Sequence, residues 1–189
     1  MKKEKINLYP FTSKDKRVPE LCGILHQDGC QLATDRFTMV VLRKQTYPND
    51  YEDKIIDRKG LLIPNRKANI HKYMWAIPDK VESRERVTFS FEPIISWYNE
   101  HKNIICPFCG SKSNKKTNKT FGLVKLGDRY FDVTRLVPVL RLMKKLKIAE
   151  VYIHKYLLYA YNDTTDILLM SFPYNDGDDV LLYIPKTNH

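Results

Sequence analysis

The sequence predicts an α+β fold in which antiparallel sheets carry one helix, or two, on one face. Apolar runs of four to eight residues recur between clusters of turn residues, as in short strands. Two Asp-Gly pairs, Asp28-Gly29 and Asp176-Gly177, lie between such runs and are typical of tight hairpin turns. The 132–147 segment alone has a sustained helical period. Many strands beside few helices are typical of the α+β class.

The N-terminal part predicts a hairpin. Leu21–Leu25 is a short apolar run, and the turn at 26–29 leads into a long predicted strand, Gln31–Leu42. The polar 46–59 segment contains Pro48, so it is expected to be a loop with an edge strand at most.

The middle of the chain predicts one more strand and a short helix. Asn65–Trp75 is the candidate for a second helix. Arg86–Glu92 alternates apolar and polar residues, which predicts a strand ended by Pro93, with Ile94–Tyr98 as a further short apolar piece.

A helix is predicted from Asp132, an N-cap, to about Lys147. Its apolar stripe consists of Val133, Leu136, Val137, Leu140 and Met143, widened by Val139, Leu142 and Leu146. Thr134, Pro138, Arg141 and Lys145 follow one outer line. Because an interior proline removes a hydrogen bond, a later start that places Pro138 in the first turn is the alternative.

Four strands are predicted after the helix. They are Ala149–His154, Leu157–Tyr161, Ile167–Pro173 and Val180–Ile184. The turn around Asp176-Gly177 predicts that the last two form a closing hairpin.

Composition limits the class of protein. A chain of 189 residues with 43% hydrophobic residues is predicted to be one domain with a real core. Apolar runs are too short to span a membrane, and no apolar stretch follows the basic start, so neither a membrane span nor a signal peptide is expected. Four cysteines are too few for a disulfide scaffold, and a reducing cytoplasm is the expected location.

The formal net charge of +10 is concentrated in one part of the chain. Residues 101–155 carry 13 basic and three acidic side chains, whereas the net charges of the segments before and after them offset each other. A directed basic face predicts an acidic partner, with nucleic acid as the first candidate. The competing interpretation is a solvated charged surface.

A Cys/Lys-rich segment at about 106–122 precedes the helix. Cys106-Pro-Phe-Cys109-Gly has the spacing of half a zinc site, and the residues from Gly110 to Thr120 contain no apolar side chain. Zinc needs about four ligands, and no second Cys-x-x-Cys is present; Cys22 and Cys30 lie in the predicted first hairpin, and His101 is nearby in sequence. A redox pair and a purely structural turn stay open as alternatives, so no cofactor is predicted outright. The segment is predicted to be an inserted loop whose lysines, Lys112, Lys115, Lys116 and Lys119, form a DNA-binding arm or keep it soluble.

Two regions resemble the bacterial DNA polymerase sliding clamp, the β subunit. Val18 to Asp35, with its Leu32-Ala33-Thr34-Asp35 ending, is similar to a strand, turn and strand of the clamp. Phe131 to Leu140, the 151–153 strand and the 181–185 run resemble the helix and closing strands of the clamp's C-terminal domain. About half of the chain takes part in this resemblance, whereas the cysteine segment has no counterpart in the family.

The resemblance implies a single clamp-like domain over 1–189, where a clamp subunit has three. Clamp helices present basic residues to the phosphate backbone, which would give Arg141 and Lys145, with Arg135 and Lys144 beside them, a non-specific DNA-binding role. Asp35 would have a structural role at the end of its strand. A ring would require a homo-oligomer.

The function predicted is therefore a non-enzymatic DNA-binding domain of clamp fold, an accessory to replication or to a mobile element and a partner of their proteins. A protein or peptide interaction module of the same fold is the alternative. No catalytic motif is present, and the close tyrosines Tyr156, Tyr159 and Tyr161 are expected to form a packed or interface face, with single-stranded DNA stacking as the alternative.

Overall fold

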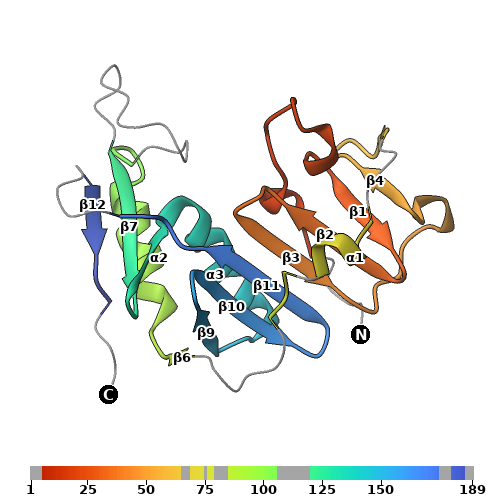
Figure 1. Ribbon diagram of the computed structural model, residues 1–189. Coiled ribbons are helices and arrows are strands. Elements are labelled where there is room, and N and C mark those ends of the chain that lie inside the picture. Colours follow the sequence, from red (N-terminus) through yellow and green to blue (C-terminus); the bar gives the residue numbers. More distant parts are fainter. Residues whose placement is uncertain are drawn as a thin grey trace. The chain divides into compact units, whose positions relative to one another are not determined.

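The computed structural model describes residues 6–64, 69–74, 76–78, 85–105, 120–174 and 180–185 (Figure 1). The backbone divides into two compact units. Unit 1 comprises Met1–Glu82 and Tyr161–Leu168, and unit 2 comprises Ser83–Ala160 and Leu169–His189. The expected single clamp-like domain stays a prediction, because two such units can form one domain or parts of two.

Unit 1 is an antiparallel sheet edged by short helical turns. Its strands follow the order β5-β4-β1-β2-β3, and each neighbouring pair among them is antiparallel. The strands are β1 (Ile24–Gln27), β2 (Cys30–Thr34), β3 (Thr38–Leu42), β4 (Lys54–Ile56) and β5 (Leu62–Ile63). The helical elements are η1 (Tyr9–Phe11), η2 (Pro19–Leu21), η3 (Asn49–Tyr51) and α1 (His71–Met74).

The predicted first hairpin is confirmed, but the long second strand is wrong. Asp28 and Gly29 both have positive φ, as the tight turn between β1 and β2 requires. The 31–42 segment breaks at Asp35, whose carboxylate accepts hydrogen bonds from the backbone N–H groups of Phe37 (3.0 Å) and Thr38 (2.7 Å). This Asx-type turn reverses the chain into β3 and is the structural role that the resemblance implied for Asp35.

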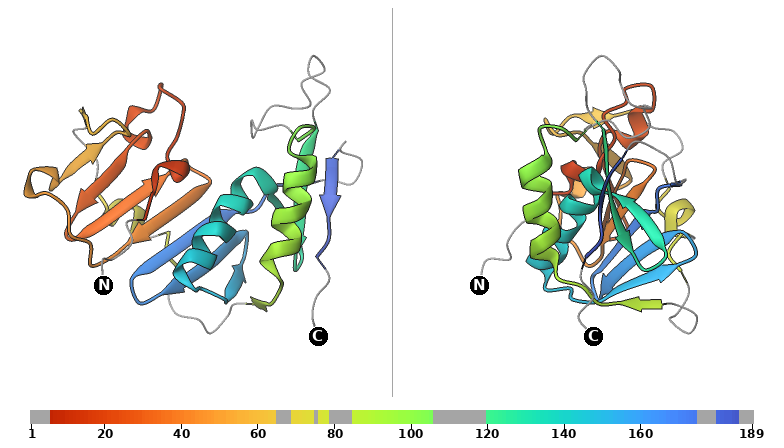
Figure 2. Two further views of the ribbon diagram at one scale, coloured as in Figure 1. Left: turned by 180° about the vertical axis from the view of Figure 1, so that it is seen from behind. Right: turned by 90° about the vertical axis from the view of Figure 1, so that its left-hand side faces the viewer.

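In its described part, unit 2 has strands of two sheets together with two helices (Figure 2). One sheet includes β6, β9, β10 and β11, and the other has the order β12-β7-β8. The strands are β6 (Glu85–Val87), β7 (Phe121–Leu126), β8 (Arg129–Asp132), β9 (Val151–His154), β10 (Leu157–Asn162), β11 (Thr165–Met170) and β12 (Val180–Tyr183). The helices are α2 (Phe91–His101) and α3 (Val133–Leu146). The end of β10, the start of β11 and the turn between them, Tyr161–Leu168, belong to unit 1.

The predicted closing hairpin is wrong. The strand β12 is present where expected, but it pairs in parallel with β7, with Val180 opposite Phe121 and Tyr183 opposite Val124. A side-chain contact supports this position, because the Trp97 ring of α2 lies 5.3 Å from the Tyr183 ring. Local turn chemistry could not predict a pairing between segments so far apart in sequence.

The predicted strand over Arg86–Glu92 is wrong beyond Val87. Only β6 is extended, and α2 starts at Phe91 with Pro93 in its first turn. A proline costs nothing there, because the first N–H groups of a helix have no intrahelical acceptor.

Helix α3 is confirmed with its cap and its core stripe. Asp132 is the N-cap, and its carboxylate accepts a hydrogen bond from the Thr134 N–H at 2.8 Å. Lys147, in the left-handed conformation, ends the helix. The fully or nearly fully buried residues are Val133, Leu136, Val137, Val139, Leu140, Leu142 and Met143. The helix runs through Pro138, so the later start is wrong.

Candidate nucleic-acid interface

The outer face of α3 presents three cationic side chains to solvent. Arg141, Lys144 and Lys145 are all exposed, whereas their neighbours Leu140, Leu142 and Met143 are buried against the rest of unit 2. Residues three and four apart lie on the same side of a helix, so the three cations form one cluster, here called the α3 basic face. This placement agrees with the sequence-based prediction for these residues.

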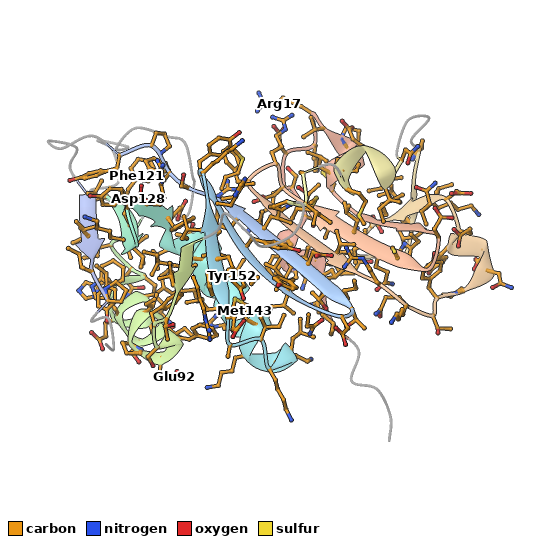
Figure 3. All side chains as sticks on the ribbon, turned by 60° about the horizontal axis from the view of Figure 1, so that its bottom comes forward. Arg17, Glu92, Phe121, Asp128, Met143 and Tyr152 are labelled. Carbon is orange, nitrogen blue, oxygen red and sulfur yellow. The ribbon has the colours of Figure 1, made fainter. Side chains whose placement is uncertain are left out.

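Helix α2 lies beside α3 and contributes polar partners to the same face. Glu92 accepts a hydrogen bond from the Lys144 ammonium at 2.7 Å, and the Asn99 side-chain oxygen accepts one from the Arg141 guanidinium at 3.2 Å. The hydrogen bond from Lys144 lowers the pKa of Glu92 most, and a backbone hydrogen bond lowers it further. Figure 3 shows Glu92 on α2 and Met143 on α3. A phosphate that binds Lys144 has to compete with this exposed carboxylate.

Arg135 lies apart from the α3 basic face. Only 16% of its side chain is exposed, and its guanidinium nitrogen lies 3.8 Å from the Asp132 carboxylate at the helix start. Arg135 therefore has less reach toward a phosphate than the other three cations of the helix.

The remaining predicted cations and the two cysteines of the predicted half zinc site lie outside the described residues. These are Lys112, Lys115, Lys116 and Lys119, with Cys106 and Cys109. Their roles in DNA and zinc binding stay predictions. Across the described ranges, no three His, Cys, Asp or Glu side chains are grouped so that they could hold a metal ion.

The other residues considered as zinc ligands have separate surroundings. Cys22 and Cys30 are free thiols, and burial raises the pKa of each. The His101 ring contacts the Trp97 carbonyl oxygen at 2.8 Å, one helical turn earlier on α2.

Sequence reasoning missed the contribution of α2. The signal was present, since Ser90 precedes a segment in which Ile94, Trp97 and His101 recur at helical spacing. The alternation of apolar and polar residues before Pro93 led instead to the prediction of a strand ended by that proline, although a proline near the start of a helix is favourable. Consequently Glu92 and Asn99, which contact the predicted DNA-binding cations, were not foreseen.

The predicted tyrosine face is divided. Tyr159 is 5% exposed and belongs to the core, Tyr161 is half-buried, and Tyr156 is 55% exposed. These three residues therefore do not form one continuous platform.

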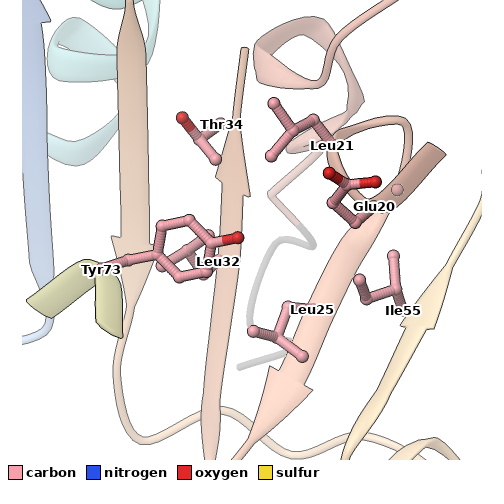
Figure 4. Close-up of a pocket in the computed structure, with 8 residues that line it drawn as sticks. Glu20, Leu21, Leu25, Leu32, Thr34, Ile55 and Tyr73 are labelled. Atoms are coloured by element: carbon pink, nitrogen blue, oxygen red, sulfur yellow. The ribbon is translucent and has the colours of Figure 1, made fainter. Parts of the chain in front are cut away.

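A cavity in unit 1 is too small for an organic ligand. It has a volume of about 10 Å³ and lies among Leu25, Leu32, Ile55 and Tyr73 (Figure 4). Such a space holds one water at most.

Comparisons with solved structures identify the fold. The DNA polymerase III subunit beta of Pseudomonas aeruginosa is similar with a TM-score of 0.54 and 14% identity, over 88% of this chain and 62% of that one. The subunit of Borrelia burgdorferi, in complex with a natural product, gives 0.55 and 10% over 87% and 58%. This chain has the fold of a bacterial sliding clamp.

The DNA polymerase sliding clamp of Bacillus subtilis is also similar, with a TM-score of 0.51 and 11% identity over 87% of this chain and 60% of that one. This chain thus spans about three fifths of the length of the solved clamps that it matches. Identities this low establish the fold alone. No protein-family model and no curated protein matches the sequence. Within the described part, no helix is long and apolar enough to cross a membrane.

Proposed function

We propose that this clamp-fold chain is a non-enzymatic protein that binds duplex DNA without sequence preference through the α3 basic face. The observation that carries the proposal is the exposed triad Arg141, Lys144 and Lys145, placed on one side of a helix whose opposite side is fully packed. Such side chains satisfy the requirement of phosphate binding, which needs positive charge along a track and no base readout.

The solved clamps that share this fold are subunits of DNA polymerase by their own descriptions, which supports a role beside replication or a mobile element. The same proposal includes a second set of phosphate contacts, from lysines that lie outside the described residues: Lys112, Lys115, Lys116 and Lys119. Replication or mobile-element proteins, and further copies of this chain, are the proposed protein partners.

The test is a charge reversal on the helix. Arg141→Glu/Lys145→Glu is expected to weaken binding to a fluorescent duplex of about 20–30 base pairs by about tenfold or more, because two cations that face phosphates are replaced by anions that repel them. Fluorescence anisotropy at several salt concentrations measures both the affinity and its salt slope. The steepness of that slope should fall by about 0.9 for each phosphate that the variant no longer neutralises.

Lys14→Glu/Lys16→Glu is the matched control, since both lysines belong to unit 1 and the net charge changes equally. The proposal fails if the two double variants lose affinity equally, or if wild-type affinity is the same at about 50 and 200 mM salt.

Glu92→Gln is expected to tighten duplex binding by about two- to threefold, because Lys144 loses its competing carboxylate and gains freedom to contact a phosphate. The same anisotropy titration measures it. The Lys144 ammonium lowers the pKa of Glu92. The attraction between the two side chains is therefore present above the ordinary pKa of a glutamate and is lost as the pH falls through the lowered pKa. At neutral pH the wild-type carboxylate is therefore ionised, and unchanged affinity in Glu92→Gln would exclude Lys144 from the contact.

A peptide-binding module is the second candidate. Two large apolar side chains at one edge of unit 2 favour it, namely Leu182 (38% exposed) on β12 and Ile184 (62% exposed) just beyond it. Exposed apolar side chains on an edge strand are typical of protein contacts. Leu182→Ser/Ile184→Ser should lower peptide or protein binding and leave duplex affinity unchanged.

A further inference from the structure

Unit 2 contains an aromatic groove that the α3 basic face does not include. The groove has a volume of about 370 Å³, within the range of about 300–1,000 Å³ that is usual for ligand sites. Its walls include Arg129, Tyr130, Tyr156, Met170, Phe172 and Tyr174. They come from β8, from the turn before β10, and from the end of β11 with the residues that follow it. We call it the aromatic groove.

Backbone contacts fix the walls of the groove. The Phe172 N–H donates to the Tyr130 carbonyl oxygen at 2.6 Å, and the Ser171 N–H donates to the Tyr156 carbonyl oxygen at 2.7 Å. The segment after β11 is therefore held by hydrogen bonds on both sides. Such a site is formed before any ligand arrives, which reduces the entropy cost of binding.

The rings at the groove pack against neighbouring rings at a tilt and leave part of their surface uncovered. The Tyr130 and Tyr174 rings lie 4.6 Å apart at 52°, and the Phe172 ring lies 5.4 Å from Phe121. Two large, mainly apolar side chains of the lining are exposed to solvent: Tyr156 is 55% exposed and Met170 is 39% exposed. A flat, partly polar ring at a groove wall offers a face on which another planar group can stack.

The charge around the groove is positive among the described residues. The Lys125 ammonium lies 5.6 Å from the centre of the Tyr130 ring. The Arg129 side chain is 42% exposed and lies 3.3 Å from Asp128, the one acidic residue of the lining. Two cations, Lys125 and Arg129, against the one carboxylate of Asp128 give these residues a net positive charge, which favours an anionic ligand.

We propose that the aromatic groove binds unpaired nucleotides, with a base stacked on Tyr156 and a phosphate beside Arg129. Exposed aromatic faces beside cations are the combination that binds single-stranded nucleic acid without sequence preference. An apolar peptide would use the rings but not the cations, so the charge favours the nucleic acid. This inference concerns a second ligand at a second surface and does not depend on duplex binding at α3.

Tyr156→Ala tests the stacking contact. In fluorescence anisotropy with a labelled oligothymidylate of about ten nucleotides, this variant is expected to bind about tenfold more weakly, because the ring on which a base stacks is removed. Phe37→Ala is the matched control, since Phe37 is 46% exposed in unit 1, and it should bind as the wild type does. Arg129→Gln should reduce both the affinity and the salt slope.

Two further measurements decide against the alternatives. Lys14→Glu/Lys16→Glu, which changes the net charge equally in unit 1, should keep at least half of the oligothymidylate affinity. A single-strand affinity abolished in Arg141→Glu/Lys145→Glu and kept in Tyr156→Ala would overturn the proposal. Ultraviolet crosslinking of a 5-bromouracil oligonucleotide should label peptides that contain Tyr156 or Tyr174. Labelling only elsewhere, or a labelled apolar peptide that binds this groove while the oligonucleotide does not, would also overturn it.

Discussion

Asp166→Ala is expected to lower the free energy of unfolding of this protein by about 3–5 kcal/mol, because it leaves a charged partner without its counterion. The Asp166 side chain on β11 is 4% exposed, and its carboxylate forms an ion pair with the guanidinium of Arg43, whose side chain is 31% exposed. Both residues lie in unit 1. Chemical denaturation followed by circular dichroism measures the loss.

The double variant Arg43→Leu/Asp166→Leu separates the charge effect from the loss of packing. Because it removes both charges and keeps apolar volume, it should recover most of the stability that Asp166→Ala loses. A decrease below about 1 kcal/mol in Asp166→Ala would show that water or another group replaces Asp166 as the partner of Arg43.

Phe131→Ala is expected to cost about 3–5 kcal/mol, because it removes a whole ring from the interior of unit 2. Phe131 is fully buried on β8, directly before the N-cap Asp132 and directly after Tyr130 of the aromatic groove. Urea denaturation gives the free energy, with the unfolding slope as a check that the transition stays cooperative.

Phe37→Ala provides the control for this second variant, because 46% of the Phe37 side chain is exposed and its truncation should cost within about 0.5 kcal/mol. If Phe131→Ala costs less than about 1.5 kcal/mol, the strands around it must collapse onto the cavity. The Phe131→Leu variant, which keeps much of the volume, should then be almost as stable as the wild type.

Sequence patterns predicted the elements whose signals are local. The helix from Asp132 was predictable because its cap, its apolar stripe and its polar line all agree, and no tertiary contact has to override them. The strands β9 to β11 were likewise predicted to within a few residues. The turn at Asp35 was missed because apolar residues continue on both sides of it. A hydrophobicity pattern does not show that a carboxylate accepts hydrogen bonds from backbone N–H groups and so stabilises a turn.

The candidate site was predictable only in part. Arg141, Lys144 and Lys145 follow from helical spacing, so the sequence alone places them on one face. Their partners Glu92 and Asn99 lie on another helix, 52 and 42 residues before Lys144 and Arg141, and only packing brings the two helices together. The aromatic groove has the same origin, since its tyrosines come from three separate segments.

The parallel pairing of β12 with β7 has a consequence for the order of folding. In a ribosome-synthesised chain, Phe121 emerges well before Val180, so one edge of β7 has no strand partner until the β12 residues have been made. Pairing of such distant segments is slow compared with helix formation, because a long loop must close first. During that interval β7, which includes the fully buried Leu123 and Val124, presents an unpaired and apolar edge. Unit 2 therefore contains an edge that needs protection from aggregation while the chain is being made.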